Sequence, residues 1–137
     1  MKKYPLLFVS ALLLASCIST QGRLLDSQTS QLQLRSIQER AFETSDRERT
    51  LRAVMATLQD LGFILDAADY GLGTVSGTRW DRVPMRITVS VRPRGETQMF
   101  VRANCQIERK PVQDPVPYQR FFAALSKSLF LEAQEVE

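Results

Sequence analysis

The 137-residue sequence contains no histidine and only two cysteines, Cys17 and Cys105. Without histidine, no imidazole can serve as a general base or a metal ligand, which excludes the commonest catalytic and zinc-binding chemistry. The acidic residues do not replace it, because none of them cluster at a metal or glycosidase spacing. Asp66 and Asp69 stand beside a turn, where we interpret them as solvated turn residues. We therefore expect no enzymatic activity, no catalytic residue, no metal and no cofactor.

The sequence also lacks a long hydrophobic run. Its most apolar stretch, residues 6–15, is interrupted by Ser10 and is too short to cross a hydrocarbon core of about 30 Å, which needs roughly 20 helical residues. Lys2 and Lys3 precede this stretch, and small residues end it. A basic start, a short apolar core and a small-residue end are typical of an export signal. We predict that residues 1–16 are a signal peptide.

The end of this segment, Leu14-Ala15-Ser16-Cys17, resembles the lipobox of bacterial lipoproteins. The resemblance implies that the Cys17 thiol receives diacylglycerol, that cleavage occurs just before it, and that the new amino terminus is acylated. Several acyl chains anchor a protein firmly, whereas one chain binds a membrane only marginally. Under the sorting rule of that family, Ile18 in place of aspartate implies the periplasmic face of the outer membrane. The alternative is an ordinary secretory signal that happens to contain a cysteine.

The chain also lacks an excess of charge of either sign once the predicted signal peptide is removed. The chain without residues 1–16 has 121 residues, enough for one domain, with 16 basic residues against 15 acidic ones. A net charge of +1 gives no reason to expect nucleic acid as a partner. Acylation of Cys17 would leave Cys105 alone, so we expect no intramolecular disulfide.

Residues 17–33 are rich in Ser, Thr and Gln and predict a flexible tether; the alternative is a helix through its leucines. Residues 34–137 form the predicted domain.

Two helices are indicated by apolar residues at spacings of three and four. The first covers about residues 46–61, with Ser45 as N-cap, Glu48 completing a capping box, and Gly62 ending the helix. The second runs from Tyr118 to about Glu132 after Pro117. Its apolar face is aromatic and consists of Tyr118, Phe121, Phe122, Leu125, Leu129 and Phe130.

Strands are predicted before and between these helices. An imperfect alternation over Leu34–Thr44 suggests a first strand. Strict period-two alternation in residues 85–92 and 98–107 predicts two half-buried strands joined by a turn at Pro93–Glu96, with Cys105 on the core side as a small buried residue. Two shorter strands, near residues 63–65 and 72–80, complete the set. The predicted fold is α+β: a four- to five-stranded, mainly antiparallel sheet with two helices on one face, in the order β-α-β-β-β-β-α.

The opposite face of this sheet is the most informative feature for function. Arg86 and Arg92 on one strand, and Phe100 and Arg102 on the next, point away from the core, and Arg79 joins them if its strand pairs alongside. An exposed aromatic residue beside arginines is typical of a protein-docking hot spot. The simpler interpretation is a solvated sheet face.

Three segments, 56–63, 73–78 and 118–122, resemble a group of small proteobacterial lipoproteins that have no assigned activity. The likeness covers roughly residues 34–137, and no functional residue carries over from it. The plan of helix, sheet and long helix is also similar to the helix-grip domains of the lipoprotein called component C of the outer-membrane barrel-assembly machine. That similarity concerns architecture alone, and architecture does not imply function.

From these observations we predict a lipid-anchored periplasmic protein of the outer membrane. Its role would be that of a non-enzymatic accessory or assembly subunit that binds a protein partner of an envelope complex. The alternative is a carrier or sensor of a small envelope ligand, such as a lipid or glycan, held between the last helix and the sheet. A sizeable apolar pocket under Phe121 and Phe122 would favour the ligand, and a filled core would favour docking.

Overall fold

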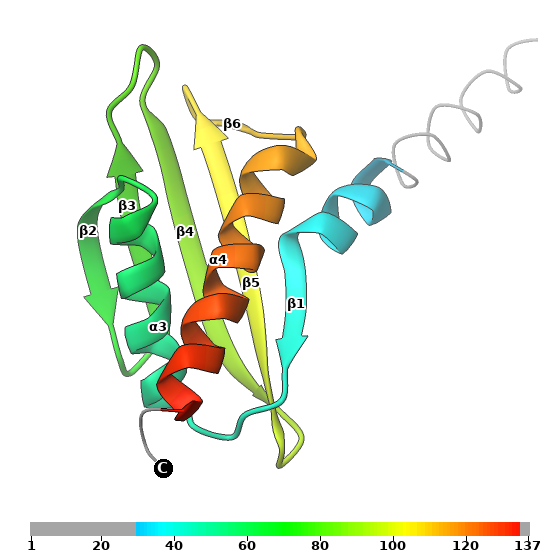
Figure 1. Ribbon diagram of the computed structural model, residues 1–137. Coiled ribbons are helices and arrows are strands. Elements are labelled where there is room, and N and C mark those ends of the chain that lie inside the picture. Colours follow the sequence, from blue (N-terminus) through cyan, green and yellow to red (C-terminus); the bar gives the residue numbers. More distant parts are fainter. Residues whose placement is uncertain (1–29, 135–137) are drawn as a thin grey trace, which may run out of the picture. The chain divides into compact units, whose positions relative to one another are not determined.

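The computed structural model describes residues 30–134, and Ser36 is the first residue of the compact unit that carries the sheet. An antiparallel sheet in the strand order β1-β5-β4-β3-β2, with β6 added beside β5, is covered on one face by α3 and α4 (Figure 1). The predicted α+β class and the placement of both helices on one face are confirmed. The elements are β1 (Glu39–Phe42), α3 (Arg47–Asp60), β2 (Ile64–Asp69), β3 (Thr74–Arg79), β4 (Met85–Arg94), β5 (Gln98–Ile107), β6 (Lys110–Pro111) and α4 (Pro115–Gln134).

Strands β4 and β5 form the longest ladder, which runs from the pair Met85 and Ile107 to the pair Arg94 and Gln98. Their side chains alternate between buried and more exposed along both strands, as the period-two pattern predicted. Val89 and Ala103 are register partners and are both fully buried. Because directly opposite residues share a face, the register also aligns the outward side chains of the two strands.

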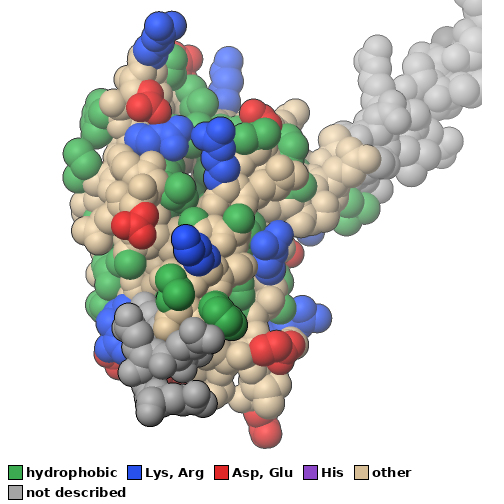
Figure 2. Space-filling model, viewed as in Figure 1, with side chains coloured by type: hydrophobic (Ala, Val, Ile, Leu, Met, Phe, Trp, Pro, Cys, Tyr) green, Lys and Arg blue, Asp and Glu red, His purple; other side chains and the backbone are tan. Residues whose placement is uncertain are grey.

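The helices close the inner face of the sheet with apolar side chains. Four residues of α4, Tyr118, Phe121, Phe122 and Leu125, are at most 1% exposed, and the rings of Phe121 and Phe122 meet edge to face with centroids 5.1 Å apart. Charged side chains of both signs lie on the solvent side of this helical layer (Figure 2). Phe130 was predicted on the same face, but it is 62% exposed. With 3.6 residues per turn, position 130 lies about a third of a turn away from the stripe of Tyr118 and Leu125.

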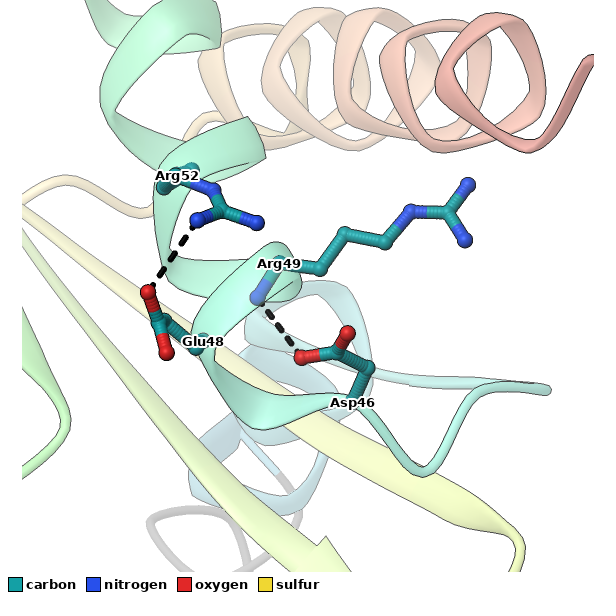
Figure 3. A network of polar contacts seen from close by, with 4 residues as sticks. All are labelled: Asp46, Glu48, Arg49 and Arg52. Carbon is teal, nitrogen blue, oxygen red and sulfur yellow. Dashed lines mark hydrogen bonds and ion pairs between the residues drawn. The ribbon is translucent and has the colours of Figure 1, made fainter. Parts of the chain in front are cut away.

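Helix α3 begins one residue later than predicted. Asp46, rather than Ser45, is the N-cap, and its Oδ1 accepts a hydrogen bond from the Arg49 backbone N–H at 2.9 Å (Figure 3). Glu48 therefore completes no capping box with Ser45 and instead pairs with Arg52 at 3.1 Å, four residues on. Aspartate caps a helix as well as serine does, so residue type alone does not decide between Ser45 and Asp46. The predicted stop is confirmed, since Gly62 has φ +83°.

The first strand is shorter than predicted. Residues 30–38 are helical, and β1 covers only Glu39–Phe42, so the strand prediction was wrong for residues 34–38. The last helical residue, Gln38, is buried and its side-chain amide donates to the Tyr118 hydroxyl at 3.3 Å, a contact that depends on the distant α4. Residues 30–33 of the predicted tether belong to this helix, and residues 17–29 lie outside the described residues.

Strand β2 forms one edge of the sheet and carries a bulge between Leu65 and Ala67. The bulge is opposite Gly77 of β3, while Gly73 lies in the turn before that strand with φ +71°. Asp69 has the predicted turn role, since its Oδ1 accepts from the Leu72 backbone N–H at 2.8 Å.

Candidate functional site on the outer face of the sheet

Three of the four residues predicted to form a docking surface lie together. Arg92 of β4 is the register partner of Phe100 of β5, and Ser90 is the partner of Arg102. All four side chains point to the outer face, which α3 and α4 do not cover. Arg86 is on the same face, but six residues before Arg92, a separation of roughly 20 Å along an extended strand. The four predicted residues therefore do not form one cluster: Arg92, Phe100 and Arg102 lie together, and Arg86 lies apart from them.

The group around Phe100 lines a hollow of about 410 Å³ in the outer face. We call it the outer-face hollow; its residues are Ser90, Arg92, Pro93, Arg94, Phe100 and Arg102. It lies near the β4–β5 turn, where the hairpin reaches its tip. Arg94 was not predicted at this site, because the sequence pattern indicated a turn at Pro93–Glu96. The strand continues through Arg94, and period-two alternation from Arg92 puts both guanidinium groups on the same face.

The charges on this face are only partly balanced. Arg102 is paired with Glu39 of β1, its register partner, and Arg86 lies 4.0 Å from Asp66 of β2. Within residues 30–131, the side chains of Arg92 and Arg94 have neither an ion-pair nor a hydrogen-bond partner, and both are exposed. The net positive charge of the outer-face hollow therefore comes from Arg92 and Arg94, which lie two residues apart on β4, next to the half-buried Phe100 of β5.

Arg79 does not join this surface. Its strand β3 does pair alongside β4, but Arg79 is the register partner of the buried Met85 and so faces the helices. The Arg79 guanidinium lies 5.1 Å from the centroid of the Phe63 ring, and its Nε donates to Asp81 at 2.7 Å. Alternation from Val75 through Gly77 would have indicated this orientation.

Arg79 belongs instead to a second cavity, of about 280 Å³, between the helices and the inner face of the sheet. We call it the interhelical pocket. Its deepest lining residues are Phe63, Met85, Ile87, Cys105 and Phe121, each at most 9% exposed. The pocket touches Phe121 but not Phe122, whose ring packs against Phe42 and lies under the Arg40 guanidinium. The cavity therefore lies under Phe121 but not under Phe122, so it matches only part of the pocket that would favour a ligand.

Cys105 is on the core side, as predicted, and is 1% exposed. Burial raises the pKa of its thiol from 9.0 to about 12, against the opposing effects of the Tyr118 hydroxyl and the Arg79 charge. The thiol is therefore neutral at physiological pH, and a neutral, buried thiol is a poor nucleophile. Cys17, the predicted lipidation site, lies outside the described residues.

Among residues 30–134, no group of three or more His, Cys, Asp or Glu side chains is arranged to hold a metal ion. In the same part of the chain, no helix has both the length and the hydropathy required to cross a membrane.

No protein-family model matches the chain, and a search of curated proteins finds no match to it. The likeness to small proteobacterial lipoproteins stays a prediction, and any function has to be argued from the residues themselves.

Proposed function

We propose that this chain is a periplasmic lipoprotein of the outer membrane, anchored through Cys17, and that its α+β domain is a non-enzymatic accessory or assembly subunit of an envelope complex. In this proposal, the outer-face hollow docks a protein partner. The observation that supports it best is the pair Arg92 and Arg94 of β4, which lack an ion-pair partner among the side chains of residues 30–131 and lie next to the half-buried Phe100 of β5.

The composition of the outer-face hollow favours a protein over a small solute. Arginine and aromatic residues are the types most enriched at hot spots, where a few side chains provide most of the binding energy. A guanidinium group donates two parallel hydrogen bonds to a carboxylate, and the Phe100 ring offers apolar area beside such contacts. The complementary partner is a segment with acidic side chains beside an apolar one.

The ion pairs of Arg86 and Arg102 support the same assignment. Each of these arginines already has a carboxylate on a neighbouring strand, so a partner gains less by replacing that contact. Exposed ion pairs contribute about 0–1 kcal/mol, so they stabilise the sheet only weakly but lower the local charge. Attraction for an acidic partner is then concentrated at Arg92 and Arg94.

The membrane anchor makes such a docking surface effective. The sequence Leu14–Cys17 supports lipidation at Cys17, and tethering raises the effective concentration of a domain near partners in the same membrane. A modest interface could then suffice for association, because the lipid anchor has already confined this domain to the membrane that holds the partner.

The test is co-isolation from membranes of the full-length protein and two double variants. Arg92→Glu with Arg94→Glu reverses the two unpaired charges of the outer-face hollow. Arg82→Glu with Arg109→Glu makes the same change in net charge at exposed positions outside it. We expect the first variant to lose its partner and the second to keep it. Equal recovery of the partner by both variants would contradict the proposal.

A further inference from the structure

The interhelical pocket has an apolar interior and a basic rim, a combination that the docking proposal does not use. Its interior consists of aliphatic side chains, the rings of Phe63 and Phe121, the Met85 thioether and the neutral Cys105 thiol. At the rim, the exposed or half-buried charged residues are Asp60, Arg79 and Arg120. Figure 2 shows basic side chains gathered at the upper end of this face, between the end of α3 and the start of α4.

We propose that the interhelical pocket binds a single-chain aliphatic carboxylate, with its hydrocarbon chain on the buried side chains of Phe63, Ile87 and Phe121 and its carboxylate at Arg120. This site goes beyond the proposed docking function and does not depend on it. The outer-face hollow lies on the other face of the sheet.

The interior selects for hydrocarbon. Phe63, Ile87 and Phe121 are at most 6% exposed and have no polar side-chain atom with which to satisfy a ligand hydroxyl. A sugar placed there would lose its hydrogen bonds to water without replacement, at a cost of roughly 1–3 kcal/mol for each group. A methylene chain gains about 0.8 kcal/mol for each CH₂ that it buries.

The rim selects for a negative charge. The Arg120 side chain is exposed and has no ion pair or hydrogen bond within residues 30–131, so its guanidinium is available to a ligand. Arg79 is held by its ion pair with Asp81 and by the Phe63 ring, so it adds little net positive charge at the edge of the pocket. Asp60 is the only acidic residue in the lining.

The start of α4 contributes in the same direction. Val116 and Pro117, in its first turn, line the pocket, and the positive end of a helix dipole favours an anion. The backbone offers few donors there, because Pro115 and Pro117 have no N–H and the N–H of Val116 already donates to Asp114 at 3.0 Å. Arg120 therefore carries the recognition.

The volume limits the ligand to one short chain. At about 30 Å³ per water-sized group, the pocket of about 280 Å³ holds about nine non-hydrogen atoms. An aliphatic carboxylate of about eight carbons has this size, whereas a diacyl lipid is several times larger. Octanoate is therefore the probe of choice.

The test is a titration of the full-length protein in nanodiscs with octanoate labelled with carbon-13 in its carboxyl group, against empty nanodiscs as the blank. We expect saturable binding to the unaltered protein. Arg120→Gln should raise Kd about tenfold or more, because it removes a charge-assisted contact. Arg82→Gln, at an exposed arginine outside the pocket, should leave Kd unchanged, and 1-octanol should bind at least about tenfold more weakly than octanoate.

Three results would overturn this site: no saturable binding above the blank, equal Kd values for the unaltered protein and Arg120→Gln, or equal affinity for octanoate and 1-octanol. The variant Arg92→Glu with Arg94→Glu separates the two proposals. It should lose the protein partner while it binds octanoate normally, so failure of one proposal leaves the other intact.

Discussion

Arg92 of β4 lies directly across from Phe100 of β5, on the face of the sheet that neither α3 nor α4 covers. The pair places a charged group without an ion-pair partner among the side chains of residues 30–131 next to a half-buried aromatic ring. Opposite residues of an antiparallel ladder are only about 4.5–5.5 Å apart at Cβ, so a partner that contacts one contacts the other.

Phe100→Ala should weaken partner binding with little effect on stability. An aromatic hot spot contributes about 2 kcal/mol or more, which corresponds to about thirtyfold in Kd. The half-buried ring lies on the outer face, so its loss leaves no cavity in the core. Binding is measured by quantitative co-isolation and stability by thermal melting. The control is Ile64→Ala on β2, which removes another outer-face side chain, one that is 63% exposed; equal losses of partner in both variants would remove Phe100 as an anchor.

Tyr118→Phe should destabilise the fold. The Tyr118 hydroxyl donates to the Val112 carbonyl oxygen at 2.8 Å and accepts from the Gln38 side chain and the Cys105 backbone N–H, both at 3.3 Å. Its removal leaves buried polar groups without a partner, at a cost of about 1–3 kcal/mol. For a domain of about 100 residues, each kcal/mol lowers Tm by about 4–8 °C. Tyr70→Phe, at a tyrosine that is 48% exposed, is the control and should melt like the unaltered protein.

Gly73→Ala should destabilise the β2–β3 turn more than Gly95→Ala destabilises the β4–β5 turn. Both glycines have positive φ, +71° and +65°, so both variants lose roughly 1–2 kcal/mol from backbone strain. A Cβ at Gly73 would also lie 2.6 Å from the Val91 carbonyl oxygen, whereas a Cβ at Gly95 meets open space. We expect about 1–3 kcal/mol of additional loss at Gly73, measured by denaturant unfolding. Equal losses would show that the turn can shift to make room.

Stability should fall at alkaline pH partly because of Cys105. Its pKa is raised by burial from 9.0 to about 12, so above about pH 9 the unfolded chain releases the thiol proton and the folded protein keeps it. The unfolded state then binds fewer protons, and the free energy of unfolding decreases as pH rises from about 9 to about 12. Cys105→Ala should lose less stability between pH 8 and pH 10.5 than the unaltered protein, in parallel denaturant titrations. Identical pH slopes would contradict the burial of a protonated thiol.

The sequence predicted the parts of the fold that depend on local periodicity. Ile87, Val89 and Val91 alternate with polar residues, and this alternation alone placed their faces. The spacing of Leu51, Val54 and Leu58 did the same for α3. Asp46 was missed as the N-cap because two adjacent residues can both cap a helix, and only the backbone geometry decides between them.

The features that were not predicted depend on which distant segments meet. The ion pair between Arg102 and Glu39 exists because β1 pairs with β5, a neighbour that is remote in sequence. The interhelical pocket depends on how the end of α3 and the start of α4 approach the sheet, which no local pattern specifies. Arg79 is different, because it lies four residues after Val75 on the same strand. Strand alternation alone therefore predicts that both side chains face the helices.

The central claim is that the outer-face hollow contacts a protein in the membrane. The most direct measurement is site-specific photo-crosslinking in intact membranes, with the photoreactive residue at position 100, followed by mass spectrometry of the adduct. We expect one discrete protein adduct at position 100, which disappears when Arg92→Glu and Arg94→Glu are added, and none at the outer-face position 64. The absence of a protein adduct at position 100, or an adduct that persists unchanged in the double variant, would contradict the proposed docking surface.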